Sequence, residues 1–175
     1  PLFPPCGSSC LFRPASAFIK VYNATLGPSR NYVYTDGIPL TGSSLSYGSI
    51  FPVNIGYALV SPNTKTITVR DTLSTTTQSP VVFNQTFVAC NFYSIFIYDT
   101  IGIIKYTVVP DKILIPSDTS AQLRLANMVF SRTPVPIVDI YSKNLNLNIF
   151  SYVTIGTVTN FISFTSKVAD ILFLQ

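Results

Sequence analysis

The sequence contains no histidine, no glutamate and no tryptophan, so all seven of its acidic side chains are aspartates. Without histidine, neither a Ser-His-Asp triad nor a Cys-His pair can be assembled within the chain. General acid-base chemistry would fall to Asp, Lys, Tyr or Cys, and no two aspartates form a close pair in the sequence. We therefore predict no catalytic residues and expect that the protein is not an enzyme.

Metal and cofactor motifs are also lacking. Cys6 and Cys10 have neither a histidine nor a second cysteine pair that would complete a tetrahedral metal site. No glycine spacing matches a phosphate-binding loop, and we expect the glycines to serve backbone turns instead. The sequence therefore predicts no metal and no cofactor.

Charge is scarce and spread out. The 11 basic residues exceed the 7 acidic ones, which gives a net charge of +4, but they do not cluster. Since nucleic-acid binding needs a basic patch, we expect no nucleic-acid partner. No apolar run approaches the ~18 to 20 residues of a membrane-spanning helix, so no transmembrane segment is predicted. The chain begins at Pro1 without a basic and apolar leader, which we interpret as a processed or trimmed product.

The residues that are abundant favour strands. The chain is 47% hydrophobic, with 10 Tyr and 13 Phe, and Val, Ile and Thr are common while strong helix formers are few. Such a composition suits pleated surfaces, so we predict an all-β fold. The first eight strands are expected at Ala17–Tyr22, Asn31–Thr35, Ser43–Ser49, Ile55–Val60, Lys65–Arg70, Val81–Val88, Phe92–Tyr98 and Ile103–Val109. Asp36-Gly37 is a signal for a two-residue hairpin.

A repeat organises the chain. Ser16–Asn23 (SAFIKVYN) and Ser120–Asn127 (SAQLRLAN) share a pattern at an offset of 104 residues. We predict an extended N-terminal arm at 1–15 because of its prolines, a complete β-sandwich at 16–110, a linker at 111–119 and a partial sandwich at 120–175. The expected correspondences are Val138–Tyr141 with Tyr32–Thr35, Gly156-Thr157 with Gly48-Ser49, Phe161–Phe164 with Tyr57–Val60, and Asp170–Phe173 with Thr66–Val69.

No segment after Asn127 corresponds to Val81–Val109, so the second module is expected to lack about three strands. Absent strands would leave core side chains uncovered and strand edges open to pairing. Two explanations stand. Another subunit supplies the strands, as in donor-strand complementation, or the polypeptide continues beyond this sequence. Candidate donors are the arm Pro1–Phe12 and the apolar tail formed by Ile171, Leu172, Phe173 and Leu174.

Modification sites are few. A disulfide between the arm, through Cys6 or Cys10, and Cys90 is one interpretation, and Cys90 as a small buried hydrophobe is the other. Sequons make Asn23 and Asn84 candidate glycosylation sites. Asn84 is the better of the two. Asn23 has a counterpart, Asn127, that is not followed by a sequon, which favours a structural role in closing the first strand.

Short motifs carry a resemblance to a known family. These motifs are SAFIKVYNA, the hairpin Val33–Gly37, Leu45–Gly48 and Lys65–Val69. They resemble a family of tandem Ig-like or transthyretin-like β-domains of unknown function, best known from bacterial surface lipoproteins. The resemblance implies an exported, non-enzymatic surface protein and supplies no catalytic residues. Neither Cys6 nor Cys10 follows a lipidation motif, which is a departure from the pattern of the surface lipoproteins.

These observations lead to a functional expectation. We expect an extracellular or cell-surface structural protein with two tandem Ig-like modules, the second incomplete, which forms a head-to-tail homopolymeric filament by strand sharing and carries glycans. The alternative is a surface module that binds carbohydrate or a protein through exposed tyrosines such as Tyr32, Tyr34 and Tyr57. Most tyrosines are nevertheless expected to pack within the fold.

Overall fold

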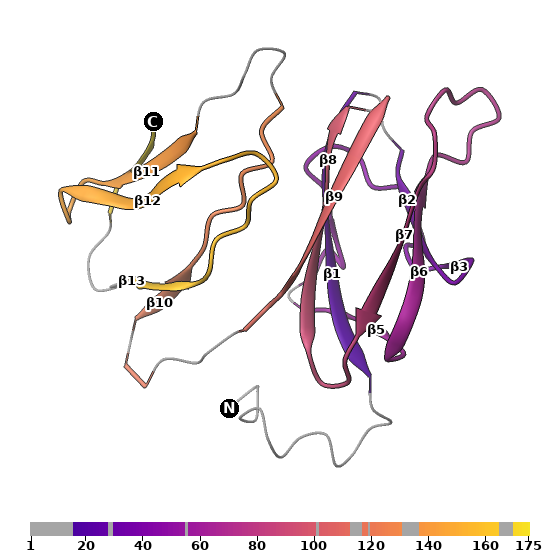
Figure 1. Ribbon diagram of the computed structural model, residues 1–175, viewed down its shortest axis with the longest axis horizontal. Coiled ribbons are helices and arrows are strands. Elements are labelled where there is room, and N and C mark those ends of the chain that lie inside the picture. The colour runs from indigo at the N-terminus through magenta and orange to yellow at the C-terminus, as the bar shows by residue number, and fades with distance from the viewer. Residues whose placement is uncertain are drawn as a thin grey trace. The chain divides into compact units, whose positions relative to one another are not determined.

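The chain forms two compact units, Pro1–Asp111 and Lys112–Gln175. A computed structural model describes residues 16–27, 30–54, 56–100, 102–112, 117–118, 120–130, 137–164 and 170–175 (Figure 1). These residues contain strands and no helix, which confirms the predicted all-β class. None of them therefore belongs to a helix that could cross a membrane. The predicted arm at 1–15 and most of the predicted linker lie outside the described residues.

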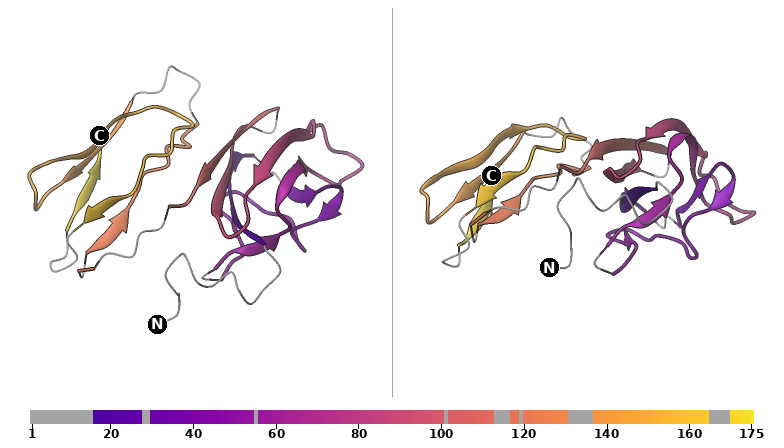
Figure 2. Two further views of the ribbon diagram at one scale, coloured as in Figure 1. Left: turned by 60° about the horizontal axis from the view of Figure 1, so that its bottom comes forward. Right: turned by 90° about the horizontal axis from the view of Figure 1, so that it is seen from below.

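The first unit is a β-sandwich-like pair of sheets. The two sheets face each other in the ribbon views (Figure 2). One sheet has the order β4-β1-β8-β9, with β5 also paired to β1, and the other has the order β3-β2-β6-β7. β1 and β8 are parallel, and every other pair is antiparallel. The strands are β1 (Ala17–Leu26), β2 (Tyr32–Thr35), β3 (Ile38–Pro39), β4 (Ile50–Phe51), β5 (Ala58–Val60), β6 (Asn63–Arg70), β7 (Val81–Phe87), β8 (Phe92–Thr100) and β9 (Ile103–Pro110).

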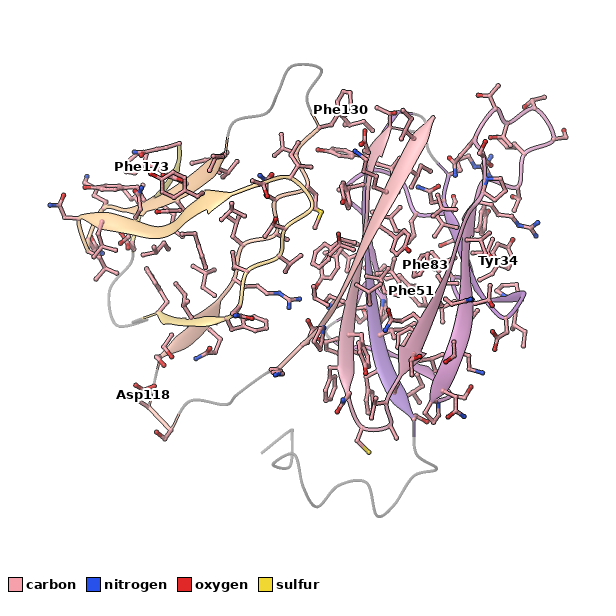
Figure 3. All side chains as sticks on the ribbon, in the orientation of Figure 1. Tyr34, Phe51, Phe83, Asp118, Phe130 and Phe173 are labelled. Atoms are coloured by element: carbon pink, nitrogen blue, oxygen red, sulfur yellow. The ribbon has the colours of Figure 1, made fainter. Side chains whose placement is uncertain are left out.

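Alternation along the strands builds the core between these sheets. On β1 the buried and half-buried residues alternate over the whole strand, as expected when one face of a strand covers a core. Each sheet contributes side chains to one buried cluster, whose fully buried members are Ala17, Ile19, Val21, Ile95 and Ile97 from one sheet and Val33, Ile67, Val69 and Phe87 from the other. The labelled Phe83 belongs to the same cluster (Figure 3).

The hairpin prediction is confirmed. Asp36 and Gly37 join β2 to β3 with φ angles of 49° and 78°, and Thr35 pairs directly with Ile38. Two successive positive φ angles are typical of the turn whose twist matches a two-residue hairpin, which explains the Asp-Gly pair. Asp36 also accepts hydrogen bonds from the backbone N–H of Thr66 at 2.9 Å and from Lys65 at 2.8 Å, which tie the turn to β6.

Three strand predictions need correction. The strand expected at Ile55–Val60 is shorter, because only Ala58–Val60 (β5) pairs with β1. Residues Ser43–Ser49 do not form a strand; they form turns, with one isolated bridge between Leu45 and Asn31. β1 continues to Leu26 rather than ending at Tyr22, because β8 pairs with it in register as far as Thr100. The alternation of Leu45, Tyr47 and their serine neighbours imitates a strand, but their backbone groups bond to Asn23 and Asn31 instead.

The described residues of the second unit contain five short strands in two small sheets. They are β10 (Ala121–Leu123), β11 (Val138–Ser142), β12 (Leu147–Val153), β13 (Ile162–Phe164) and β14 (Leu172–Leu174). β10 pairs with β13, and β11 lies between β12 and β14, all antiparallel. The buried apolar side chains among its described residues are only three, Val138, Phe150 and Val153.

Candidate functional site: the open edges of the second unit

A buried asparagine anchors a turn in the first unit. Asn23 is 2% exposed, and its Nδ2 donates to the carbonyl of Leu45 at 2.8 Å while its Oδ1 accepts from the N–H of Thr25 at 3.2 Å. Its backbone N–H donates to Ser49 O, and its carbonyl accepts from Gly48 N–H. Gly48 has a φ of 78°, which only glycine adopts without strain. Asn23 therefore holds the turn onto β1.

The same turn occurs in the second unit. Asn127 is buried, its Nδ2 donates to Val153 O at 2.8 Å, and its Oδ1 accepts from Val129 N–H at 3.2 Å. Its backbone N–H and carbonyl bond to Thr157 O and Gly156 N–H, and Gly156 has a φ of 77°. The expected correspondence between Gly48-Ser49 and Gly156-Thr157 is thus present bond for bond. We call this arrangement the asparagine-anchored turn.

Strand register is repeated as well. Ala17 pairs with Val60 and Ile19 with Ala58 on β1 and β5. On β10 and β13 the pairs are Ala121 with Phe164 and Leu123 with Ile162, each partner displaced by 104 residues.

A cation–π contact repeats at the same offset. The Nζ atom of Lys20 lies 5.8 Å from the ring centre of Tyr57, and the guanidinium carbon of Arg124 lies 4.5 Å from that of Phe161. The expected match of Phe161–Phe164 with Tyr57–Val60 holds in this register.

Two of the expected correspondences are displaced by one residue. The bridge between Asn31 and Leu45 has its equivalent in the pair Val138 and Val153. This match makes Ile140 the counterpart of Val33. Val33 pairs with Val69 and Ile140 pairs with Leu174. The offset is therefore 107 for β2 and 105 for β6, in place of the predicted 106 and 104.

Three strands of the first unit have no counterpart among the described residues of the second. β8 pairs with β1 in parallel from Phe18 opposite Phe92 to Leu26 opposite Thr100, and β7 pairs with the far edge of β6. β10 pairs only with β13, and β14 pairs only with β11, within the described part of the chain. Within the described part of the second unit, no strand corresponds to β7, β8 or β9, and no described strand pairs with the second edge of β10 or of β14.

Burial shows what the missing strands would cover. Ile67 and Val69 of β6 are fully buried, whereas their counterparts Leu172 and Leu174 are 42% and 66% exposed. On the other sheet, Ala17 and its two inward-facing neighbours on β1 are fully buried, while Ala121 is exposed and Leu123 and Leu125 are half-buried. Several positions that are buried in the first unit are therefore partly or largely exposed in the second, although Val153, the counterpart of Leu45, stays buried.

The apolar tail proposed as a donor is an edge strand of its own unit. Leu172, Phe173 and Leu174 pair with Ser142, Tyr141 and Ile140, and the labelled Phe173 ring lies 6.3 Å from that of Tyr141 (Figure 3). One edge of β14 is thus already occupied. Ile171 precedes the strand, and its carbonyl accepts from Lys143 N–H. The tail is therefore already paired within its own unit, and the arm Pro1–Phe12 lies outside the described residues.

The two sequons differ in accessibility. Asn23 is buried, and the Nδ2 atom that would carry a sugar donates to Leu45 O, so the fold has no room for a glycan there. The structural interpretation of Asn23 replaces its prediction as a glycosylation site. Asn84 lies exposed on β7, where its Oδ1 accepts from the Thr66 hydroxyl at 3.0 Å and its environment is compatible with a sugar.

Cys90 is disulfide-bonded, and its partner lies outside the described residues. It sits in the turn between β7 and β8 with a φ of 64°, and its N–H donates to Ser16 O at 2.8 Å. The interpretation of Cys90 as an unpaired buried hydrophobe is therefore wrong. The roles of Cys6 and Cys10 remain predictions.

The tyrosines singled out by the carbohydrate-binding alternative make contacts within the fold. The guanidinium of Arg70 lies 4.6 Å from the ring centre of the labelled Tyr34 (Figure 3), and the Tyr57 hydroxyl donates to Asp111 at 2.9 Å. Tyr32 is half-buried on β2 and pairs with Arg70. These positions favour packing over ligand contact.

Hydrogen bonds within the fold lower the pKa of two aspartates. The hydrogen bond from Lys65, helped by one from Thr66 N–H, lowers the pKa of Asp36. The hydrogen bond from the Ser142 hydroxyl is the largest cause that lowers the pKa of Asp170, which also accepts from Asn144 and Ile171 N–H. Among the described residues, no three His, Cys, Asp or Glu side chains gather as a metal site would require.

Comparison of the chain with protein-family models and with curated protein sequences gave no match in either case.

Proposed function

We propose that this protein is a non-enzymatic structural protein of the extracellular space or cell surface, and that its second unit is completed by strands from a neighbouring copy. The observation that carries the proposal is the contrast between buried Ile67 and Val69 and their exposed counterparts Leu172 and Leu174. The two units share the asparagine-anchored turn and the register of one strand pair, which supports the interpretation of the second as a module of the same type.

The energetic argument is simple. Covering a large aliphatic side chain contributes about 1.5 to 3 kcal/mol when it passes from full exposure to full burial. Leu172 and Leu174 are about half exposed, so each would gain about 1 kcal/mol from a covering strand, before any gain at β10. Backbone hydrogen bonds along the two open edges would add to this. A net domain stability is only about 5 to 15 kcal/mol, so these terms matter.

The geometry of such a contact decides the form of the assembly. A strand that leaves one copy and enters the second unit of the next makes a head-to-tail contact between different surfaces. Such contacts do not close on themselves unless the rotation between copies happens to form a ring. The expected product is therefore an open filament of two tandem Ig-like modules per copy, the second completed in trans.

Location outside the cell is supported by the disulfide at Cys90, since disulfides persist in oxidising compartments. The exposed Asn84 would then meet glycosylation enzymes if the host has them. The family resemblance of the sequence motifs implies the same setting.

The test is the size of the purified chain over a range of concentrations, by light scattering and negative-stain imaging. We expect concentration-dependent filaments. Leu174→Lys, which places a charge on the uncovered face of β14, should shift the distribution to monomer at least tenfold. Ile38→Lys is the matched control, because Ile38 is 70% exposed on β3 of the first unit and lies at no open edge of the second. A folded monomer at every concentration would refute the proposal.

A further inference from the structure

We infer that the strand completing β10 runs parallel to it, in the register that β8 has on β1, and carries apolar residues only at alternate positions. The inference rests on the proposed function for its source, a neighbouring copy of the chain. Its orientation and register come independently from the first unit.

Among the described residues, β10 pairs along one edge, which leaves the other edge for such a strand. On β1, Ala17–Ile19 pair with β5, and Asn23 bonds to Ser49, all on one edge, while β8 occupies the other edge. On the second unit the equivalent first edge is taken, because Ala121–Leu123 pair with β13 and Asn127 N–H donates to Thr157 O. The incoming strand must therefore lie where β8 lies on β1.

The length of β10 supports this placement. β1 is regular over ten residues, and nine of them, from Phe18 to Leu26, have a partner on β8. β10 is regular over only three residues and continues as a single bridge between Ala126 and Val158. Pairing on one edge alone thus sustains a short strand, and a second partner would extend it.

The side chains of β10 define what the partner needs on each face. On the inner face, the partner must cover half-buried Leu123 and Leu125, as Tyr93, Ile95 and Ile97 of β8 cover the core of the first unit. On the outer face the requirement differs. Phe18 stacks on Phe92 at 4.6 Å and Tyr22 stacks on Phe96 at 4.7 Å.

The residues equivalent to Phe18 and Tyr22 are Gln122 on β10 and Ala126, which follows β10 as an isolated bridge. Neither offers an aromatic face for stacking. The partner therefore needs apolar residues on its inner face and small or polar residues on its outer face, and it differs from β8 in this respect.

Orientation can be read by disulfide trapping. The full chain would carry Gln122→Cys or Ala126→Cys, both half-buried positions on the outer face. The probes are synthetic peptides with the sequence of Phe92–Thr100, capped at both ends, extended by two lysines, and carrying cysteine at the Phe92 or the Phe96 position. A scrambled peptide and the unaltered chain, which contains Cys6, Cys10 and Cys90, serve as controls.

The parallel register places position 92 beside residue 122 and position 96 beside residue 126. We expect these two matched pairs to cross-link at least tenfold faster than the two mismatched pairs, as counted by mass spectrometry of non-reduced digests. An antiparallel strand would reverse the preference and overturn the inference. Equal rates, or no cross-link above the scrambled peptide, would overturn it too.

A second pair of probes tests the face requirement. In each peptide the Phe that was not changed to cysteine, at position 92 or 96, is replaced by Thr. This change should alter the cross-linking rate by no more than about twofold. Replacing the inner Ile95 and Ile97 by Thr should reduce it at least tenfold. The outcomes also separate this inference from the proposed function. If the matched pairs cross-link faster but the chain stays monomeric, the parallel register is supported and the filament is refuted. If filaments form but the mismatched pairs cross-link faster, the filament is supported and the parallel register is refuted.

Discussion

Removing the side chain of Asn23 should destabilise the first unit substantially. Asn23→Ala removes three hydrogen bonds, to Leu45 O at 2.8 Å, from Thr25 N–H at 3.2 Å and from the Asn31 side chain at 3.2 Å. A buried hydrogen bond contributes about 0.5 to 1.5 kcal/mol net, and the two longer bonds belong at the lower end. The free energy of unfolding should therefore fall by about 2 to 4 kcal/mol, which includes a small cavity term.

The assay is urea unfolding followed by far-ultraviolet circular dichroism and tyrosine fluorescence, since the chain has no tryptophan. With a denaturant dependence of about 1 to 3 kcal/mol per molar, the midpoint of the first unit should fall by about 1 to 2 M. Asn127→Ala removes two equivalent bonds and should act on the second unit, with a loss of about 1 to 3 kcal/mol.

Asn84→Ala is the matched control, because that side chain is exposed, and it should change stability by less than about 0.5 kcal/mol. Asn23→Asp separates the amide donor from simple volume, because it keeps the shape but turns an oxygen towards Leu45 O. It should destabilise the unit at least as much as alanine does. If Asn23→Ala unfolds within about 0.5 kcal/mol of the unaltered chain, the reasoning about the asparagine-anchored turn is refuted.

Three further predictions concern the same units. Gly48→Ala and Gly156→Ala should each lower stability by about 1 to 2 kcal/mol in thermal unfolding, because both glycines have a φ near 78°. Gly42→Ala, where a Cβ meets nothing within 4 Å and φ is not positive, should be nearly neutral and serves as their control. Because the pKa of Asp36 is lowered in the folded chain, its contribution to stability is present above the unfolded pKa of about 3.9 and is lost as pH falls through the folded pKa. Lys65→Met should raise the Asp36 midpoint in an NMR titration, and an unchanged midpoint would contradict the assigned cause. In a host that performs N-glycosylation, sugar mass should appear on the Asn84 peptide and not on the Asn23 peptide, and Asn84→Gln should remove it.

Local patterns in the sequence predicted the elements that depend on local chemistry. The alternation of β1 and the Asp36-Gly37 hairpin require only side-chain periodicity and turn preference, and both are present. The prediction of a strand at Ser43–Ser49 was wrong because long-range bonds decide the structure there. Its alternating pattern is strand-like, but its backbone is committed to long-range bonds with Asn23 and Asn31, which no local window contains.

Pairing between strands was less accessible from the sequence. β8 is buried on both faces for six consecutive residues, Tyr93–Tyr98, and it lies parallel to β1, so its periodicity carries little information about its neighbours. The buried network of Asn31, Gln78 and Thr25 also escaped prediction. Asn, Gln and Thr are mostly surface residues, and only the structure shows that they satisfy one another inside the first unit.

The one-residue displacement in the repeat decides which side chains the proposed interface uses. At the predicted offset of 104, Ile67 and Val69 would correspond to Ile171 and Phe173. The observed register makes their counterparts Leu172 and Leu174, since Leu174 pairs with Ile140 as Val69 pairs with Val33. Successive residues of a strand face opposite sides, so this shift of one exchanges the inner and outer faces of β14. A charge at position 174 therefore tests the uncovered inner face. A charge at position 173, on the outer face beside Tyr141, should leave assembly unchanged, and equal effects at both positions would show that β14 is not covered in the manner of β6.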